Sequence, residues 1–448
     1  MTANERTPGR KMENAVKERG ERLYRKAFAL SQAGRRVEAG HYLREAAAAG
    51  HGPAAYTLAT RLFPENGEDG AKEVRLLLET AERAGLAPAA HLLAVMDTHG
   101  LGLAGPAPAK GLARIAGWAK NEDPGAMRQL AMLALLEDEE CAEATILLAQ
   151  AAQRGDVPAL LVLARARAQG NETARRISLP PLAEKLRTGL ARLGHPGIAL
   201  LENDARDAED DAVPLKIERQ ELAAIVETLT ALAGRALKIP PEPPRPPDER
   251  HVGEGGYEVL QWRNCWSQLA CDHVMAIAAP AMRPSMVMDP RDGRMKPHPY
   301  RRSLNASLFP WDQDLVSAAL EARLAALASR PPEHGEVLSV LCYHPGGEYR
   351  PHLDALTAGE GRSGEELARS GQRTHTVLIR LSENFEGGET AFPKAGLQLA
   401  VGVGDALLFR NADEAGRPDP LSLHAGMPVL RGVKWMATKW IRERRYRW

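Results

Sequence analysis

The sequence predicts a multidomain α + β protein, in which an N-terminal α-helical repeat solenoid is followed by a double-stranded β-helix, or jelly roll. Residues 21–236 are rich in Ala, Leu, Arg and Glu, with apolar residues at helical spacing. A proline-rich segment follows, and beyond Glu336 apolar and polar residues alternate in short runs between Gly and Pro turns. We therefore expect helical repeats over 1–235, a linker over 236–250 and a β-rich domain over 251–448.

The helical region contains five similar segments, each with a turn residue followed by Pro or small residues. The segments are 49–55, 84–90, 121–126, 154–160 and 193–199. Their spacing of roughly 35 residues is typical of helical hairpins that bury their apolar faces only by stacking on one another. The pattern resembles Sel1-like repeats, which are relatives of the tetratricopeptide class.

The proposed linker has six prolines within nine residues, at 239–247. Such a segment cannot continue a helix, so it marks a domain boundary. Beyond it, the pattern predicts helices over 267–279 and 313–328, and strands over 337–343, 374–381, 406–409 and 433–441.

The charge balance and the cysteine count exclude several classes of protein. Fifty-eight basic and 58 acidic residues balance, so no overall field favours nucleic acid or an anionic membrane. No apolar run is long enough for a signal peptide or a membrane span. We expect a protein of the reducing cytoplasm, because no CxxC pair occurs among the four cysteines, Cys141, Cys265, Cys271 and Cys342.

The chemistry is suggested first by the triplet His352-Leu353-Asp354. On a strand, residues two apart face the same side, so His352 and Asp354 can reach one metal ion. A second strand would then deliver His424. Two imidazoles and one carboxylate on one face of Fe(II) leave the opposite positions open, as in non-haem iron oxygenases.

Lys434 lies ten residues after His424, in a β-prone segment with Met436, Thr438 and Trp440 on the same face. One interpretation is an edge-strand lysine that discourages aggregation. The other is a buried cation that neutralises the distal carboxylate of 2-oxoglutarate. The segment alone leaves both open.

A family resemblance becomes clear when the motifs are taken in order. They are Tyr343 through Asp354, Gly371-Gln372-Arg373, Glu386 through Pro393, Gly404-Asp405-Ala406, Pro418 through Gly426, Pro428-Val429-Leu430 and Lys434-Trp435. Over roughly residues 255–448 the chain resembles the prolyl 4-hydroxylases of the Fe(II)/2-oxoglutarate dioxygenase superfamily.

The resemblance implies a role for each matching residue. Iron would be held by His352, Asp354 and His424, and the catalytic set would also include Lys434. Lys434, Tyr343 and Thr390 would hold the distal carboxylate of 2-oxoglutarate, while Tyr349, Arg373 and Trp440 would contact the substrate or shape its entrance. Fe(II), 2-oxoglutarate and O₂ are the implied cofactor and cosubstrates, with ascorbate as reductant. Without the resemblance, Tyr349 and Trp440 read as core aromatics, Thr390 as a strand residue and Arg373 as a solvated turn residue.

Two features depart from the family or leave its reading open. Arg380 occupies a strand position that the family often gives to an aromatic or apolar residue. The stretch 356–372, rich in Gly, Ser and Glu, is interpreted either as a lid that orders over the substrate or as a disordered surface insertion.

We therefore expect a hydroxylase of prolyl residues in a cytosolic protein or peptide, which yields succinate and CO₂. The alternatives are a hydroxylase of free proline or another small molecule, and a repeat scaffold with a catalytically silent jelly roll. Collagen is disfavoured as substrate because no targeting signal is visible. Helical repeats build concave surfaces, so the N-terminal region is expected to bind the substrate or another protein.

Overall fold

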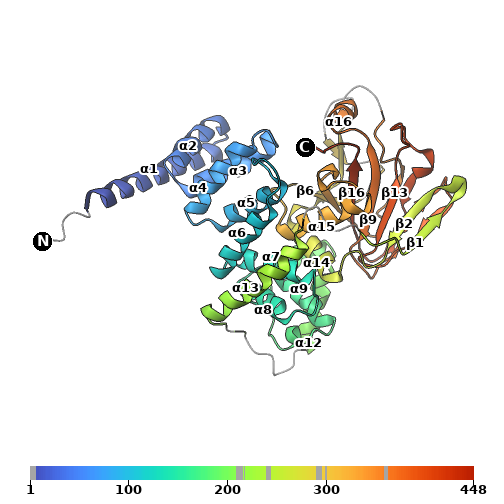
Figure 1. The fold of residues 1–448 in the computed structure, drawn as a ribbon, viewed down its shortest axis with the longest axis horizontal. Helices are drawn as coiled ribbons and strands as arrows, with labels where there is room; N and C mark the ends of the chain where they lie inside the picture. The colour runs from blue at the N-terminus through green and yellow to red at the C-terminus, as the bar shows by residue number, and fades with distance from the viewer. Residues whose placement is uncertain are drawn as a thin grey trace. The chain divides into compact units, whose positions relative to one another are not determined.

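The computed structural model describes residues 7–207, 215, 217–238, 244–288, 295–297, 300–357 and 362–447. The expected fold class is confirmed, with helices first and antiparallel sheets after them (Figure 1). The helices are α1 (Thr7–Gln32), α2 (Arg36–Ala48), α3 (Gly52–Asn66), α4 (Ala71–Arg83), α5 (Ala87–His99), α6 (Pro108–Lys120), α7 (Pro124–Leu135), α8 (Ala142–Gln153), α9 (Val157–Ala168), α10 (Glu172–Arg175), α11 (Glu184–Arg192), α12 (Pro196–Asp207), α13 (Arg219–Ala236), α14 (Gln268–Ala278), α15 (Leu315–Leu327) and α16 (Arg362–Ser370).

The chain forms two compact units, residues 1–118 and 119–447. The second unit therefore contains the later helices, from α7 onward, together with the whole β-rich region. The boundary expected at the proline-rich segment stays a prediction, and residues 239–243 of that segment lie outside the described residues.

The recurring segments of the sequence each become the start of a helix: α3, α5, α7, α9 and α12. His51, Asp123 and Asp156 cap three of them, because each side chain accepts a hydrogen bond from the backbone N–H three residues on. Pro in the first turn suits the helix start, where its missing N–H removes no helical hydrogen bond. The helical expectation is confirmed, and the Sel1-like assignment stays a prediction.

Within the first unit, an ionic group ties α4, α5 and α6 together. Asp97 is fully buried and accepts a hydrogen bond from Arg75 at 2.7 Å, while Arg114 lies 3.4 Å from its other oxygen. Arg114 also pairs with Glu82. A buried carboxylate is tolerable there because it has cationic partners.

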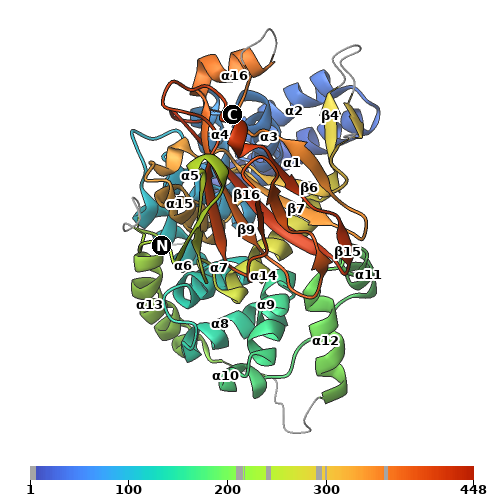
Figure 2. The ribbon, with the colours of Figure 1, turned by 90° about the vertical axis from the view of Figure 1, so that its right-hand side faces the viewer.

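The second unit is built around two facing antiparallel sheets. The larger has the order β1-β2-β13-β9-β16-β7-β6-β3 and the smaller β12-β11-β14-β8, with β10-β15 and β4-β5 as further pairs. Figure 1 shows β13, β9 and β16 side by side, and Figure 2 shows β16 with β7 and β6. The strands are β1 (Glu249–Val252), β2 (Glu258–Trp262), β3 (Arg283–Pro284), β4 (Met286–Met288), β5 (Met295–Pro297), β6 (Leu304–Leu308), β7 (Leu338–Tyr343), β8 (Tyr349–His352), β9 (Arg373–Arg380), β10 (Glu386–Gly387), β11 (Thr390–Phe392), β12 (Leu397–Leu399), β13 (Ala406–Arg410), β14 (His424–Gly426), β15 (Val429–Arg431) and β16 (Lys434–Arg442).

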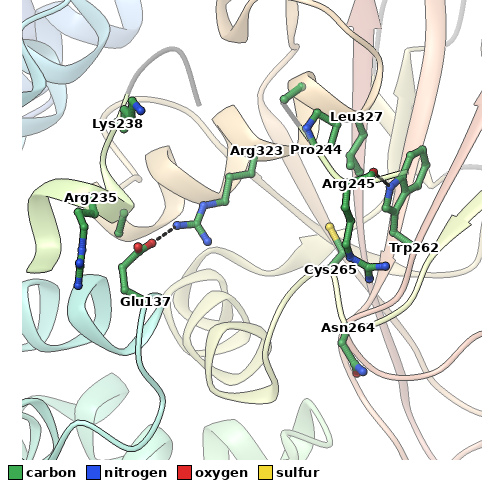
Figure 3. A pocket seen from close by; sticks show the side chains of 12 residues that line it. Glu137, Arg235, Lys238, Pro244, Arg245, Trp262, Asn264, Cys265, Arg323 and Leu327 are labelled. Carbon is green, nitrogen blue, oxygen red and sulfur yellow. Dashed lines mark hydrogen bonds and ion pairs between the residues drawn. The ribbon is translucent and has the colours of Figure 1, made fainter. Parts of the chain in front are cut away.

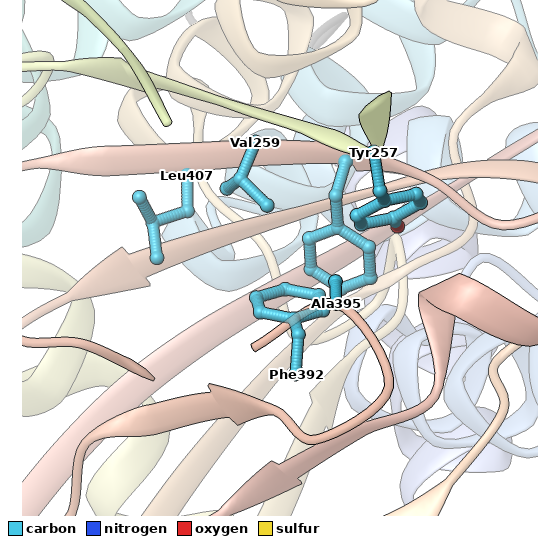
Figure 4. Packing of buried hydrophobic residues seen from close by; sticks show 6 residues of the cluster. Tyr257, Val259, Phe392, Ala395 and Leu407 are labelled. Atoms are coloured by element: carbon cyan, nitrogen blue, oxygen red, sulfur yellow. The ribbon is translucent and has the colours of Figure 1, made fainter. Parts of the chain in front are cut away.

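One apolar core joins the two sheets at the end nearest His424. It contains Tyr257, Val259, Phe392, Ala395, Leu407 and Phe409, shown in Figure 4. Phe409 packs edge-on against the His424 ring, with centroids 4.8 Å apart. The core therefore holds one wall of the site described below.

Helices α7 and α9 pack against α15 and α14 within the same unit. Arg128 on α7 pairs with Asp314, the N-cap of α15, at 2.5 Å, and Arg165 on α9 pairs with Asp272 on α14 at 2.6 Å. All four side chains are buried. Figure 2 shows α9 beside α14. Buried ion pairs thus join α7 and α9 to α15 and α14, the helices that accompany the sheets.

Candidate active site

Two paired strands, β8 and β14, bring the predicted metal ligands together. His352 ends β8, Asp354 follows two residues later, and His424 begins β14, which pairs with β8 at His352. Their ligand atoms lie within 4.8 Å of one another. Among the described residues, this is the one group of three or more His, Cys, Asp or Glu side chains with such spacing.

Both imidazoles are oriented by backbone carbonyls. Nδ1 of His352 donates to the carbonyl of Arg350, and Nδ1 of His424 donates to that of Ser422, each at 2.9 Å. Because a carbonyl only accepts, each ring keeps its proton on Nδ1 and leaves the Nε2 lone pair for a metal ion. Each Nε2 lies 3.5 Å from a carboxylate oxygen of Asp354. This donor set fits a divalent iron ion.

Asp354 is held as a carboxylate. Burial raises the pKa of its carboxyl, but the two imidazoles and Arg373 together hold that pKa well below its usual range. The Thr376 hydroxyl donates to Oδ2 of Asp354 at 2.7 Å, and Asn411 donates to the Thr376 oxygen at 2.8 Å. This polar chain fixes the carboxylate orientation and was not predicted from sequence. The period-2 pattern of β9 was the available signal, since Thr376 lies on the same face as the cavity residue Leu378.

Eight of the nine predicted site residues line one cavity of about 50 Å³. They are Tyr343, Tyr349, His352, Asp354, Thr390, His424, Lys434 and Trp440. Apolar side chains from β7, β9 and β16 complete the wall, together with Arg301, whose position no sequence pattern indicated. The metal group and the expected carboxylate anchor therefore share one cavity.

Lys434 is buried and lies on β16, which runs between β9 and β7 within the eight-stranded sheet. The edge-strand interpretation is therefore wrong. Its Nζ donates to the carbonyl of Gly388 and lies 5.6 Å from the centre of the Tyr343 ring. Burial, with the nearby Arg380 cation, lowers the pKa of Lys434 to about 8, against an opposing effect of Glu389.

The ninth residue, Arg373, lies behind the cavity wall. It makes two hydrogen bonds to the Glu336 carboxylate, at 2.6 and 2.9 Å. Its guanidinium lies over the Trp440 ring, 4.1 Å from the centroid. It therefore supports Trp440 and Asp354 from behind, and the solvated-turn interpretation is wrong because the side chain is largely buried.

Two other sequence features can now be placed. Arg380 donates to the carbonyls of Ser382 and Val401, at 2.8 and 2.7 Å, and lies over the Phe385 ring. In the stretch 356–372, residues 362–370 form α16, and residues 358–361 lie outside the described part. Gln372 both donates to and accepts from the backbone of Leu356, which joins the two ends of this stretch. Its role as a lid stays a prediction.

A larger cavity, of about 800 Å³, lies elsewhere in the second unit (Figure 3). It is lined by the end of α13, the end of α15 and the turn after β2. Figure 3 shows Glu137 paired with Arg323 across part of it, at 2.8 Å. It shares no lining residue with the metal group, so the small cavity is the candidate active site.

Comparison with known proteins agrees with this geometry. Residues 338–442 match the family model of the 2OG-Fe(II) oxygenase superfamily. Prolyl 4-hydroxylase 1 of Arabidopsis thaliana is 36% identical over 214 residues, which cover 43% of this chain and 74% of that protein. The chain belongs to the prolyl 4-hydroxylase family of 2-oxoglutarate-dependent Fe(II) oxygenases. Prolyl 4-hydroxylase 5 of the same plant is 34% identical over 220 residues, covering 43% of this chain and 73% of that protein.

A solved structure also resembles part of the chain. The viral collagen prolyl hydroxylase of Paramecium Bursaria Chlorella virus-1 is 24% identical, with a TM-score of 0.33, and covers 43% of this chain and 99% of that one. As a member of the family, the protein is a 2-oxoglutarate-dependent dioxygenase, for which Fe(II), 2-oxoglutarate and O₂ are the implied cofactor and cosubstrates. Among the described residues, no helix has the length and apolar character needed to cross a bilayer.

Proposed function

We propose that the protein hydroxylates prolyl residues of a cytosolic protein or peptide. The observation that carries the proposal is one shared cavity. The group of His352, Asp354 and His424 and the buried cation Lys434 all line it. A metal group alone would suit many oxidations. A metal group with a carboxylate anchor suits a reaction that consumes 2-oxoglutarate.

In this proposal the three ligands hold iron through the two Nε2 atoms and the Asp354 carboxylate. Iron supplies the redox chemistry by which one atom of O₂ enters succinate and the other enters the product hydroxyl, with release of CO₂. The chain's own residues bind 2-oxoglutarate, orient the substrate and exclude water from the site.

Lys434, Tyr343 and Thr390 hold the distal carboxylate of 2-oxoglutarate. The Lys434 ammonium supplies the charge, and the hydroxyls of Tyr343 and Thr390 supply hydrogen-bond donors in the same cavity. Burial makes such a charge-assisted hydrogen bond strong and makes an empty site costly, which favours a ligand that carries a full negative charge.

The remaining wall suits an apolar ring. Leu341, Leu378 and Met436 line the cavity and keep water from the reacting carbon. Tyr349 and Trp440 offer aromatic faces against which a pyrrolidine ring packs. Arg373 takes part indirectly, by fixing Trp440.

The test is succinate formation by Fe(II)-loaded protein supplied with 2-oxoglutarate and O₂, with and without proline-containing peptides. We expect peptide-stimulated turnover and a product peptide heavier by one oxygen atom. His352→Ala should abolish both, while His251→Ala, a histidine on β1 outside the site, should retain them. Stimulation by free proline but by no peptide would favour the small-molecule alternative. Absence of metal and 2-oxoglutarate binding would favour the silent scaffold.

The same assay tests ascorbate, which we propose as the reductant that keeps the iron in its divalent form. Repeated turnover should decline faster when ascorbate is omitted and should recover when it is added. A decline that ascorbate does not reverse would contradict this role.

A further inference from the structure

The turn between α11 and α12, residues Leu193–His195, touches the back of the strands that carry Lys434 and Tyr343. The Cys342 thiol donates to the carbonyl of Leu193 at 3.4 Å. The His195 ring meets Trp435 edge-on, with centroids 5.9 Å apart and planes at 72°. Gly194 approaches Val433 so closely that a Cβ at Gly194 would overlap the valine side chain.

Strand register explains why these contacts bear on the active site. On the paired strands β7 and β16, Tyr343 lies opposite Lys434, and Cys342 lies opposite Trp435. Side chains alternate along a strand, so Lys434 and Tyr343 face the cavity while Cys342 and Trp435 face the other side. The turn thus contacts the chain neighbours of Lys434 and Tyr343, two of the residues that we assign to the 2-oxoglutarate carboxylate.

The turn is itself held firmly. Gly194 has φ +60°, a conformation that suits glycine, and Nδ1 of His195 accepts a hydrogen bond from the N–H of Gly197 at 3.1 Å. His195 is 2% exposed, and burial lowers the pKa of its imidazole to about 4, so the ring stays neutral. Leu193 packs on an apolar cluster that includes Leu161 of α9 and Ala276 of α14. A shift of the strand would therefore have to move several packed helices.

A second set of contacts links α9 to Val433 and Trp435. Arg165 on α9 donates to Glu383 at 2.9 Å as well as to Asp272. The adjacent Ser382 hydroxyl donates to the carbonyl of Val433 at 3.1 Å and accepts from the N–H of Trp435 at 2.8 Å. Val433 and Trp435, the residues on either side of Lys434, are therefore both held by Ser382 as well as by the turn.

We propose that the α11–α12 turn is a positioning element that sets the affinity of the site for 2-oxoglutarate. Gly194 and His195 act through Val433 and Trp435 on the placement of the Lys434 ammonium. The inference rests on the proposed role of Lys434 as the carboxylate anchor. Hydrogen bonds hold over a donor–acceptor range of only a few tenths of an ångström, so a small displacement of the strand weakens the contact of the ammonium with a bound carboxylate.

The first experiment substitutes Gly194→Ala in the full chain. The added Cβ should push the strand at Val433 and weaken 2-oxoglutarate binding about tenfold, as expected for a misplaced anchoring group. Binding is measured by calorimetry on Mn(II)-loaded protein, and KM for 2-oxoglutarate should rise while kcat at saturation changes by less than about twofold. Gly189→Ala is the matched control, because a Cβ at this α11 position meets no atom within 4 Å.

A second variant, His195→Gln, retains a polar side chain but removes the ring contact with Trp435. We expect about threefold weaker binding of 2-oxoglutarate and unchanged Mn(II) affinity, and this variant decides the matter if Gly194→Ala does not fold. Folded variants with wild-type affinity for 2-oxoglutarate would overturn the inference. The proposed function fails separately, if the wild-type chain binds 2-oxoglutarate but hydroxylates no proline-containing peptide.

Discussion

The Thr376 hydroxyl donates a 2.7 Å hydrogen bond to Oδ2 of Asp354, from the strand directly behind the metal group. A donor in this position orients a carboxylate ligand, and loss of such a partner commonly weakens metal binding by about 10- to 100-fold. The first prediction is therefore that Thr376→Val lowers Fe(II) or Mn(II) affinity by about tenfold or more. Metal titration under anaerobic conditions measures it.

The control for that variant lies two residues earlier on the same strand. The Thr374 hydroxyl donates to the carbonyl of Ile441 at 3.2 Å and touches no carboxylate. Thr374→Val should leave metal affinity unchanged. Equal losses in both variants would mean that the effect comes from the strand and not from the hydrogen bond to Asp354.

Arg373 should matter for stability as well as for the site. Glu336 is buried and pairs with Arg373 and with Arg442. Because Arg373→Met leaves the carboxylate with one cation in a dry environment, we expect it to reduce the free energy of unfolding by about 2–3 kcal/mol. Denaturant titration measures this. Arg410→Met, which removes an exposed pair with Asp419, should cost no more than about 0.5 kcal/mol.

Binding of 2-oxoglutarate should depend on pH through Lys434. With its pKa lowered to about 8, the ammonium is charged below that pH and loses its proton above it. Affinity should stay constant from pH 6.5 to about 8 and then weaken by up to about tenfold per pH unit. The measurement is a pH series of 2-oxoglutarate titrations on the Mn(II)-loaded protein.

The lowered pKa of Lys434 also affects the stability of the fold: stability rises with pH over the range in which 2-oxoglutarate binding weakens. Between about pH 8 and the ordinary lysine value of 10.5, the unfolded chain binds more protons at this residue than the folded chain, so Lys434 contributes a gain in stability as pH rises.

The variant Lys434→Arg tests the pH dependence of 2-oxoglutarate binding. Its guanidinium keeps its charge throughout this pH range, so the variant should remove that dependence. Wild-type affinity that is flat from pH 7 to 9.5 would contradict the assignment.

Truncation should separate the two compact units. A chain that begins at residue 119 retains the Arg128–Asp314 and Arg165–Asp272 pairs, so we expect it to fold and to bind 2-oxoglutarate. A chain that begins at residue 251 exposes Asp272, Asp314 and the apolar surface of α14, so we expect it to aggregate or to melt at a much lower temperature. Circular dichroism and thermal melting decide between these outcomes.

The shorter truncation also tests whether the first unit binds substrate. If α1–α6 dock the substrate protein, removal of residues 1–118 should lower kcat/KM for that protein and leave kcat/KM for a short peptide unchanged. Equal values for the full chain and the truncated chain on both substrates would contradict docking.

Much of the site could be predicted because local sequence patterns determine which side chains share one face of a strand. The His-x-Asp triplet places two ligands on one face, and alternation along 433–441 places Lys434, Met436, Thr438 and Trp440 together, as the cavity confirms. The helix starts at α3, α7 and α9 likewise follow from a capping residue and a proline a few positions apart.

What the sequence by itself determined, then, was the kind of element in the segments with a clear pattern and the identity of the candidate ligands, because periodicity and capping depend on neighbours in the chain. Only the tertiary structure decided that Lys434 lies mid-sheet, that Arg373 is paired with Glu336, and that Gly194 meets Val433. These relations join residues that are tens or hundreds of positions apart. They depend on strand order and helix packing, which no local pattern encodes.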